Sequence, residues 1–148
     1  MPLHPQTWLR PMPGGLYCEP GGFFIDPSRP VDRAVITHGH GDHARSGHGK
    51  AAATAETLAI MGVRYGEGFA RETQALAYGE RISLGDVTLM LEPAGHILGS
   101  AQVVLEHGGC RAVISGDYKR RFDPTCPPFT PVKCDVFITE ATFGLPVF

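Results

Sequence analysis

Short runs of hydrophobic residues, each ended by glycine or proline, recur along most of the chain. In residues 81–94 and 100–117, hydrophobic and polar positions alternate on both sides of a two-residue turn. The turns are Gly85 with Asp86 and Gly108 with Gly109. Alternating runs joined in this way are typical of β-hairpins. The pattern therefore predicts two antiparallel strand pairs.

Three more runs have the composition of strands. Residues 33–37 read Arg-Ala-Val-Ile-Thr and predict a buried strand, while residues 22–27 predict a short strand that stops at proline. Residues 134–141 predict a last strand. The first fifteen residues are rich in proline, so we expect them to be irregular.

One stretch has the pattern of an amphipathic helix. In residues 55–66, the apolar positions Leu58, Met61 and 63–65 recur at helical spacing, and Thr54 is a suitable N-cap residue. Many strands and few helices predict an α/β (α+β) fold, in which a mixed β-sheet has helices packed outside it.

Composition restricts the class of protein. The chain has 148 residues, which fits one domain, and its formal net charge of -2 excludes an overall basic field for nucleic acid. No apolar run approaches the roughly 20 residues of a membrane span, and the N-terminus lacks the apolar core of a signal peptide. We therefore expect a cytoplasmic protein without a membrane partner. The cysteines form no CxxC pair and are expected to be reduced: Cys18, Cys110, Cys126 and Cys134.

Four of the seven histidines lie between positions 38 and 48, directly after the predicted strand 33–37. His38 and His40 are two residues apart, so at a strand end their side chains point the same way and can share one metal ion. Asp42 and His43 follow on the turn and are suited to a second ion. A solvated histidine-rich loop is the alternative, but H-x-H-x-D-H after an apolar strand favours a metal site.

Two more candidate ligands follow later strands. His96 lies just after the predicted strand 87–91, and Asp117 follows Gly116 at the end of the second hairpin. A carboxylate in this position can bridge two metal ions about 3.5–4 Å apart. Taken singly, each residue is also consistent with an ordinary loop position. His48 is expected at the surface or behind the ligands, because the preceding residues already complete the motif.

The order of these motifs resembles a known superfamily. H-x-H-x-D-H, then Gly-His in a loop, then Ser-Gly-Asp after a strand is similar to the metallo-β-lactamase superfamily. Residues 137–144, FITEATFG, resemble the acidic motif that opens its β-CASP branch, whose members are nucleases. GDYKRR and DVFITEATFGLPVF most resemble the ligase-associated DNA exonucleases, which are related to messenger-RNA 3′-end processing factors. The resemblance runs from about Trp8 to Phe148.

The resemblance implies an αββα sandwich that carries two zinc ions, with manganese as the alternative metal. Asp26 matches the family's first motif and would accept a hydrogen bond from a ligand histidine, although a turn aspartate before Pro27 is the plainer reading. Glu140 matches the acidic residue of the β-CASP branch and would orient a histidine that assists the leaving group. The matches to the metal ligands are His38, His40 and His96 for one ion, Asp42 and His43 for the other, and Asp117 for both.

The family's later histidines have no counterpart here, since no histidine follows His107. We therefore expect residues 1–148 to be the N-terminal part of one metallo-β-lactamase-like domain, without the β-CASP insert and the C-terminal strands. The resemblance implies a metal-dependent nuclease in the full-length form and an inactive 148-residue chain alone.

A short basic run, Lys119, Arg120 and Arg121, follows Asp117 closely. Three like charges are consistent with a solvated surface or with contacts to a DNA backbone, and the sequence leaves both open. The resemblance implies a zinc-dependent phosphodiester hydrolase, specifically a DNA exonuclease that acts in DNA repair beside a DNA ligase. The alternatives are an RNA-processing nuclease of the same branch and a metal-binding fragment without turnover.

Overall fold

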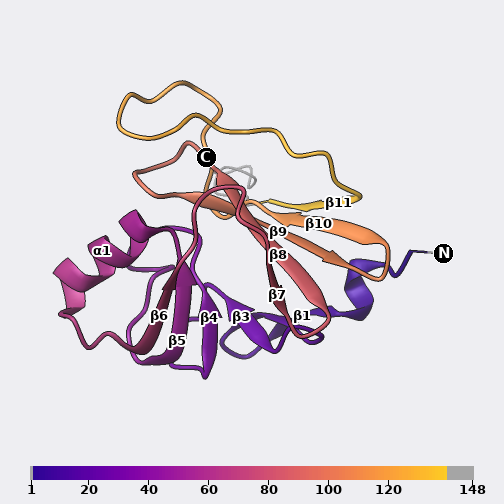
Figure 1. Ribbon diagram of the computed structural model, residues 1–148, viewed down its shortest axis with the longest axis horizontal. Coiled ribbons are helices and arrows are strands. Elements are labelled where there is room, and N and C mark those ends of the chain that lie inside the picture. The colour runs from indigo at the N-terminus through magenta and orange to yellow at the C-terminus, as the bar shows by residue number, and fades with distance from the viewer. Residues whose placement is uncertain (1, 140–148) are drawn as a thin grey trace, which may run out of the picture.

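Two β-sheets face each other in the computed structural model, which describes residues 2–139 (Figure 1). The strands of the first sheet, in sheet order, are β1 (Leu9–Met12), β2 (Gly15–Cys18), β3 (Phe23–Ile25), β4 (Arg33–Val35), β5 (His48–Ala53) and β6 (Ala70–Ala75). Those of the second are β11 (Val136–Ile138), β10 (Cys110–Ile114), β9 (Ala101–His107), β8 (Val87–Pro93) and β7 (Ile82–Leu84). A 3₁₀ turn, η1 (Pro5–Thr7), precedes the first sheet, and α1 (Ala55–Tyr65) joins β5 to β6.

Alternation along β4 and β5 separates two hydrophobic cores. Val35 and Ala52 point into the space between the sheets, whereas Ala34 and Ala51 point to the opposite face, because successive side chains of a strand alternate. The opposite face is covered by α1, whose Met61 is fully buried there. Residues 33–37 thus lie in a layer covered on both sides, which explains their continuous apolar run.

The second sheet supplies most of the core between the sheets. Every second residue of β8 is buried, and most residues of the neighbouring strands β9 and β10 are buried as well. These inward side chains are Val87, Leu89, Leu91, Ala101, Val103, Leu105, Cys110, Ala112 and Ile114. Two rigid sheets packed through this core hold the loops at one end of the strands in fixed positions.

Both predicted hairpins and the predicted helix are present. Gly85 and Asp86 join β7 to β8, and Gly108 and Gly109 join β9 to β10. The side chain of Thr54 caps α1 by accepting a hydrogen bond from the backbone N–H of Thr57. The mixed-sheet α/β fold class is confirmed, with mixed strand directions in both sheets.

Three details of the sequence prediction were wrong. Val63, assigned to the buried face of the helix, is 90% exposed, since Met61 and Leu58 already face the sheet. The N-terminal segment is not irregular throughout, because it contains η1 and the edge strand β1. Strands β5 and β6 were missed: β5 is half alanine, and β6 is a polar edge strand, so neither has the usual strand composition. Among residues 2–139, no helix is long and apolar enough to cross a membrane.

A long loop, residues 115–135, connects β10 to β11 along the side of the second sheet that faces away from the first (Figure 1). Gln102 on β9 holds this loop, because its Nε2 donates hydrogen bonds to the carbonyl oxygens of Pro93 (3.0 Å) and Thr130 (2.8 Å). The backbone N–H of Thr130 donates to the carbonyl of Pro93 as well (3.1 Å). The loop therefore occupies a fixed path.

Candidate metal centre

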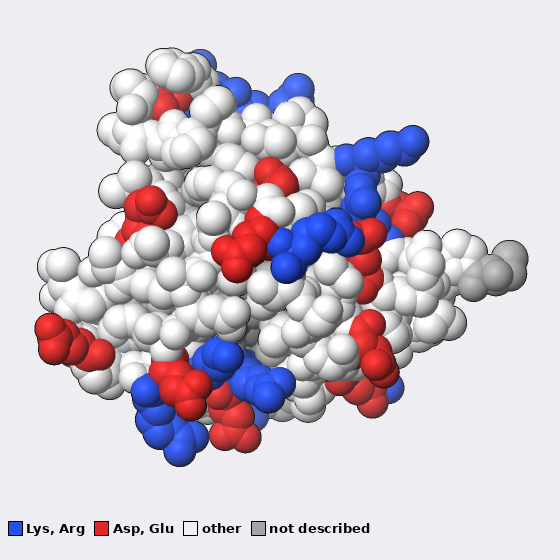
Figure 2. Space-filling model, in the orientation of Figure 1, with Lys and Arg blue, Asp and Glu red and all other residues white. Residues whose placement is uncertain are grey.

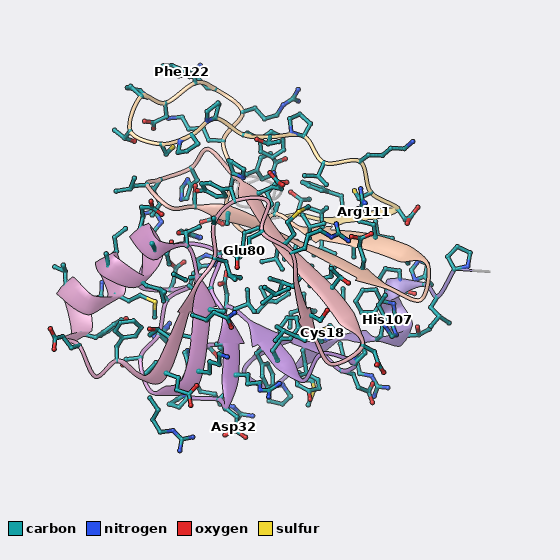
Figure 3. The ribbon with its side chains drawn as sticks, in the orientation of Figure 1. Cys18, Asp32, Glu80, His107, Arg111 and Phe122 are labelled. Carbon is teal, nitrogen blue, oxygen red and sulfur yellow. The ribbon has the colours of Figure 1, made fainter. Side chains whose placement is uncertain are left out.

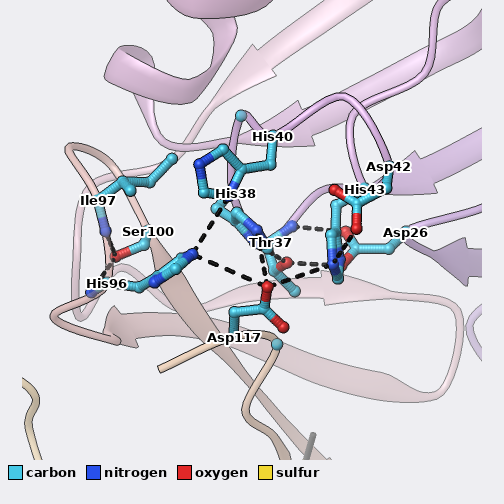
Figure 4. A network of polar contacts seen from close by, with 12 residues as sticks. Asp26, Thr37, His38, His40, Asp42, His43, His96, Ile97, Ser100 and Asp117 are labelled. Atoms are coloured by element: carbon cyan, nitrogen blue, oxygen red, sulfur yellow. Dashed lines mark hydrogen bonds and ion pairs between the residues drawn. The ribbon is translucent and has the colours of Figure 1, made fainter. Parts of the chain in front are cut away.

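Loops that follow three different strands meet at one end of the two sheets. His38, His96 and Asp117 each lie three residues past the end of a strand, namely β4, β8 and β10. His40 follows His38 after one residue, and its ring lies beside that of His96, with the ring centroids 5.0 Å apart. Figure 4 shows the four side chains converging on a common point.

The ligand atoms of this group have the spacing of a metal site. In His38, His40, His96 and Asp117, one ring nitrogen or carboxylate oxygen each lies within 4.8 Å of the others. His40 Nδ1 is 3.2 Å from His96 Nε2, and Asp117 Oδ2 is 3.5 Å from His38 Nε2 and 3.8 Å from His96 Nε2. Around a tetrahedral zinc ion, ligands at about 2.0–2.1 Å lie roughly 3.3 Å apart. The cluster thus fits such an ion with small adjustments.

His38 is the clearest test of that fit, because it is fully buried and its Nε2 has no hydrogen-bond partner among the described residues. Burial, and then the neighbouring imidazoles of His43, His96 and His40, lower the pKa of His38 to about 3. The ring is therefore neutral at pH 7, as a ligand must be. A buried polar atom normally has a hydrogen-bond partner. His38 Nε2 has none among the described residues and points toward the other ligand atoms, which indicates that a cation binds there.

Asp117 also faces a second group, on the other side of His38. Its Oδ2 lies 3.6 Å from His43 Nε2, which is in turn 3.5 Å from Asp42 Oδ2. A hydrogen bond from His43 Nδ1 to Asp26 raises the pKa of His43 against the opposing effect of burial, and the charges of Asp26, Asp117 and Asp42 act in the same direction. The Asp42 side chain is 74% exposed. The structure therefore places one carboxylate between two sets of candidate ligands.

Asp26 is an acceptor in this centre rather than a ligand. It could be grouped with His38 and His43 as a metal site on distance alone. Its oxygens, however, already accept hydrogen bonds from the backbone N–H of Thr37 (2.7 Å), the hydroxyl of Thr37 (2.5 Å) and Nδ1 of His43 (2.7 Å). The backbone φ of Asp26 is 46°, a value that residues other than glycine rarely adopt. This turn directs the carboxylate toward Thr37 and His43.

Thr37 fixes the tautomer of His38, although no sequence motif singles it out. Its hydroxyl proton must go to Asp26, because a carboxylate can only accept. The same hydroxyl oxygen lies 2.9 Å from His38 Nδ1, so it accepts the proton that Nδ1 carries. Nε2 of His38 is then left with its lone pair toward the cluster. Asp26 sets the tautomer of His43 directly in the same way.

Glycine and serine hold the later ligands in position. Gly116 has φ of +56°, and a Cβ on it would lie 2.7 Å from the Thr37 hydroxyl, so only glycine fits between Thr37 and Asp117. In the loop of His96, Ser100 Oγ accepts hydrogen bonds from the backbone N–H groups of His96 (3.0 Å) and Ile97 (3.2 Å). Ser100 is a second residue that sequence reasoning missed.

The remaining predicted residues lie apart from the cluster. His48 is neither a ligand nor at the surface: it is fully buried at the start of β5, and its Nδ1 accepts a hydrogen bond from the backbone N–H of Val31 (3.2 Å). Lys119 lies two residues beyond Asp117 in the loop 115–135, and Arg120 and Arg121 are exposed on the same loop. Glu140 lies outside the described residues.

Known proteins with similar sequences include enzymes that act on nucleic acids. No family model matches the chain. A probable DNA ligase of Opitutus terrae is 35% identical over 134 residues, which are 89% of this chain and 13% of that protein. A ribonuclease of Thermus thermophilus is 33% identical over 147 residues, covering 82% of this chain and 34% of its own length. An endoribonuclease of Mycosarcoma maydis is 28% identical, covering 77% and 17%.

Solved structures share the architecture. A metallo-β-lactamase mutant of Cronobacter sakazakii matches with a TM-score of 0.57 at 15% identity, over 84% of this chain and 69% of that one. A second mutant of that enzyme gives a TM-score of 0.56 over 88% and 71%. The chain thus covers most of the β-lactamase fold but only a minor part of the sequence relatives. The fold is thus that of a metallo-β-lactamase, and the sequence relatives support the resemblance to the β-CASP nucleases of that superfamily.

Proposed function

We propose that the chain carries the metal centre of a zinc-dependent phosphodiester hydrolase, a cytoplasmic DNA exonuclease that acts in DNA repair beside a DNA ligase. The observation that carries the proposal is the position of Asp117, whose Oδ2 faces His38 and His96 on one side and His43 on the other. One carboxylate shared by two sets of ligands is the arrangement that two-metal hydrolysis requires.

Zinc ions bound here would lower the pKa of a water molecule to about 7 and neutralise charge on the phosphate. In the proposed site, His38, His40 and His96 would hold the first ion, and Asp42 and His43 would hold the second. Asp117 would be shared by both. The protein itself orients His38 and His43, because His38 is buried against Thr37 and His43 is hydrogen-bonded to Asp26.

The roles of the other residues concern protons. Asp26 keeps the proton of His43 on Nδ1, and Thr37 does the same for His38, so both rings offer Nε2. Glu140 is proposed to orient a histidine that protonates the leaving group. We propose that residues 1–148 form the N-terminal part of a single metallo-β-lactamase-like domain.

We propose DNA rather than RNA as the substrate because the relative with 35% identity is described as a probable DNA ligase. A nuclease on the same chain as a ligase, or beside it, would trim ends that the ligase then seals. RNA is the second candidate, favoured by the match to the Thermus ribonuclease over 82% of this chain. The two candidates share the proposed metal chemistry and differ only in the strand that they accept.

The test compares hydrolysis of DNA and RNA oligonucleotides of matched sequence by the full-length protein that contains this chain. Samples are metal-free, zinc-loaded or manganese-loaded, and His96→Ala is compared with the surface variant Arg71→Ala. We expect DNA cleavage from the end, dependent on metal and lost in His96→Ala. Cleavage of RNA alone would support the second candidate, and metal binding without any cleavage would refute both.

A further inference from the structure

An aromatic side chain projects into solvent from the loop between β10 and β11. Phe122 is 70% exposed, more than any other aromatic residue in the described part of the chain. Figure 3 shows it at the outer tip of the loop, away from both sheets. Covering an exposed phenylalanine is favourable, so this ring is available to a binding partner.

The tip is held by a set of hydrogen bonds on both sides of Phe122. On one side, the backbone N–H of Lys119 donates to the carbonyl of Ala94 (3.0 Å). On the other, Asp123 accepts hydrogen bonds from the backbone N–H (2.9 Å) and the hydroxyl (2.6 Å) of Thr125. Lys119 Nζ also donates to Asp123 (3.1 Å), which closes the turn across its base. Phe122 is thus presented by an ordered turn.

Two arginines directly precede this phenylalanine in the sequence. Asp123 pairs with Lys119, so among the described residues of the turn Arg120 and Arg121 carry the remaining charge, and both are exposed. Figure 2 shows basic side chains along the upper edge of the molecule, where this loop lies. Guanidinium groups bind phosphates, and an aromatic ring stacks on bases, which together are the parts of a single-strand binding site.

The turn is also close enough to the metal centre to touch the same strand. Phe122 is five residues beyond Asp117, and a chain spans at most about 3.6 Å per residue, so the two lie within about 18 Å. A duplex hides its base faces within its own stack, whereas an unpaired strand leaves them open to an aromatic side chain. The partner that fits is therefore single-stranded.

We propose that Arg120, Arg121 and Phe122 form a binding surface for a single-stranded segment of the DNA substrate, with Phe122 stacking on a base and the arginines contacting phosphates. The proposal rests on the proposed function, since it names where that substrate extends beyond the metal centre. The three basic residues of this run then have different roles. Lys119 stabilises the turn, and Arg120 and Arg121 bind phosphates.

The first experiment measures binding of a fluorescein-labelled single-stranded oligonucleotide to the metal-free protein, which separates binding from cleavage. Phe122→Ala is expected to weaken binding by about 5- to 150-fold, the usual effect of losing one aromatic–base stack. Phe122→Trp is expected to retain affinity, and its emission should be quenched by the oligonucleotide. Trp8 is the only tryptophan among residues 1–148 and is buried, so the quenching that Phe122→Trp adds to that of the unmodified protein reports on position 122.

The second experiment addresses the arginines through the salt dependence of binding. Each of Arg120→Ala and Arg121→Ala should reduce the slope of log affinity against log salt by about 0.7, the value for one phosphate contact on a single strand. Val63→Ala and Arg71→Ala, which alter an exposed aliphatic and an exposed cation elsewhere, should change neither affinity nor slope.

Equal affinity of Phe122→Ala and the unmodified protein would overturn the proposal, as would a preference for a blunt duplex over a single strand. Hydrolysis of DNA with no effect of Phe122→Ala on binding would refute this surface and leave the proposed function standing. Binding that depends on Phe122 without any hydrolysis would support this surface and refute the proposed function.

Discussion

Thr37 offers a sharp test of how the protein prepares its metal centre. Its hydroxyl accepts a hydrogen bond from His38 Nδ1 (2.9 Å) and donates one to Asp26 (2.5 Å), and Thr37 and His38 are fully buried. Thr37→Ser removes only the methyl group, whereas Thr37→Ala removes the methyl group and the hydroxyl. The difference between these two variants therefore measures the hydroxyl alone.

The magnitude follows from the two hydrogen bonds. A hydrogen bond to a charged group contributes about 1.5–3 kcal/mol, and a neutral one about 0.5–1.5 kcal/mol. The free energy of unfolding of Thr37→Ala should therefore be about 2–4.5 kcal/mol lower than that of Thr37→Ser, measured by urea unfolding of the metal-free proteins. Loss of an orienting partner typically lowers metal affinity about 10- to 100-fold. Competition with a chromophoric chelator should show that loss for zinc in Thr37→Ala, relative to Thr37→Ser. Affinities within twofold of each other would refute the tautomer argument.

Three further outcomes are expected. Asp117→Ala should reduce the zinc bound per chain, whereas Asp26→Ala should keep the stoichiometry and weaken affinity about 10- to 100-fold, as dialysis and metal analysis would show; equal effects would exclude the shared role of Asp117. Burial lowers the pKa of His48, so as pH falls this histidine is protonated in the unfolded chain before it is protonated in the folded one. The free energy of unfolding should therefore decrease below about pH 6.5, by up to roughly 1.4 kcal/mol per pH unit. Urea unfolding at pH 5.5 and 7.5 should show a weaker dependence in His48→Asn. Gly116→Ala should lower the melting temperature and zinc affinity together, because its Cβ would meet the Thr37 hydroxyl at 2.7 Å; an unchanged melting temperature would contradict that contact.

The sequence was sufficient for features that depend on neighbouring residues. The hairpin turns at Gly85 and Gly108, the Thr54 cap and the H-x-H-x-D-H motif are local patterns, and each has one favoured geometry. The meeting of His96 and Asp117 with the motif was expected because all three follow strands. It depends on the pairing of β9 with β10, which the second hairpin predicted, and on the pairing of β8 with β9, which neither predicted hairpin specified.

Features that depend on distant contacts were out of reach. Strand β6 is polar because one edge has no neighbouring strand, and β5 is recognisable only from its place between β4 and β6. Thr37 appeared to be the last residue of a strand, and its role emerges only when Asp26, eleven residues earlier, lies against it. No sequence pattern indicates that Phe122 is exposed, and only the path of the loop shows it. Composition cannot reveal such positions, because their meaning lies in tertiary packing.

The most direct test of the account is an anomalous difference map at the zinc absorption edge, from crystals of the zinc-loaded protein. We expect a zinc peak about 2.0–2.1 Å from His38 Nε2 and from ring nitrogens of His40 and His96, with an Asp117 oxygen at about 2.0–2.2 Å. A zinc peak elsewhere, for instance on Cys110 and Cys134, with these four side chains unliganded in an ordered site, would contradict it.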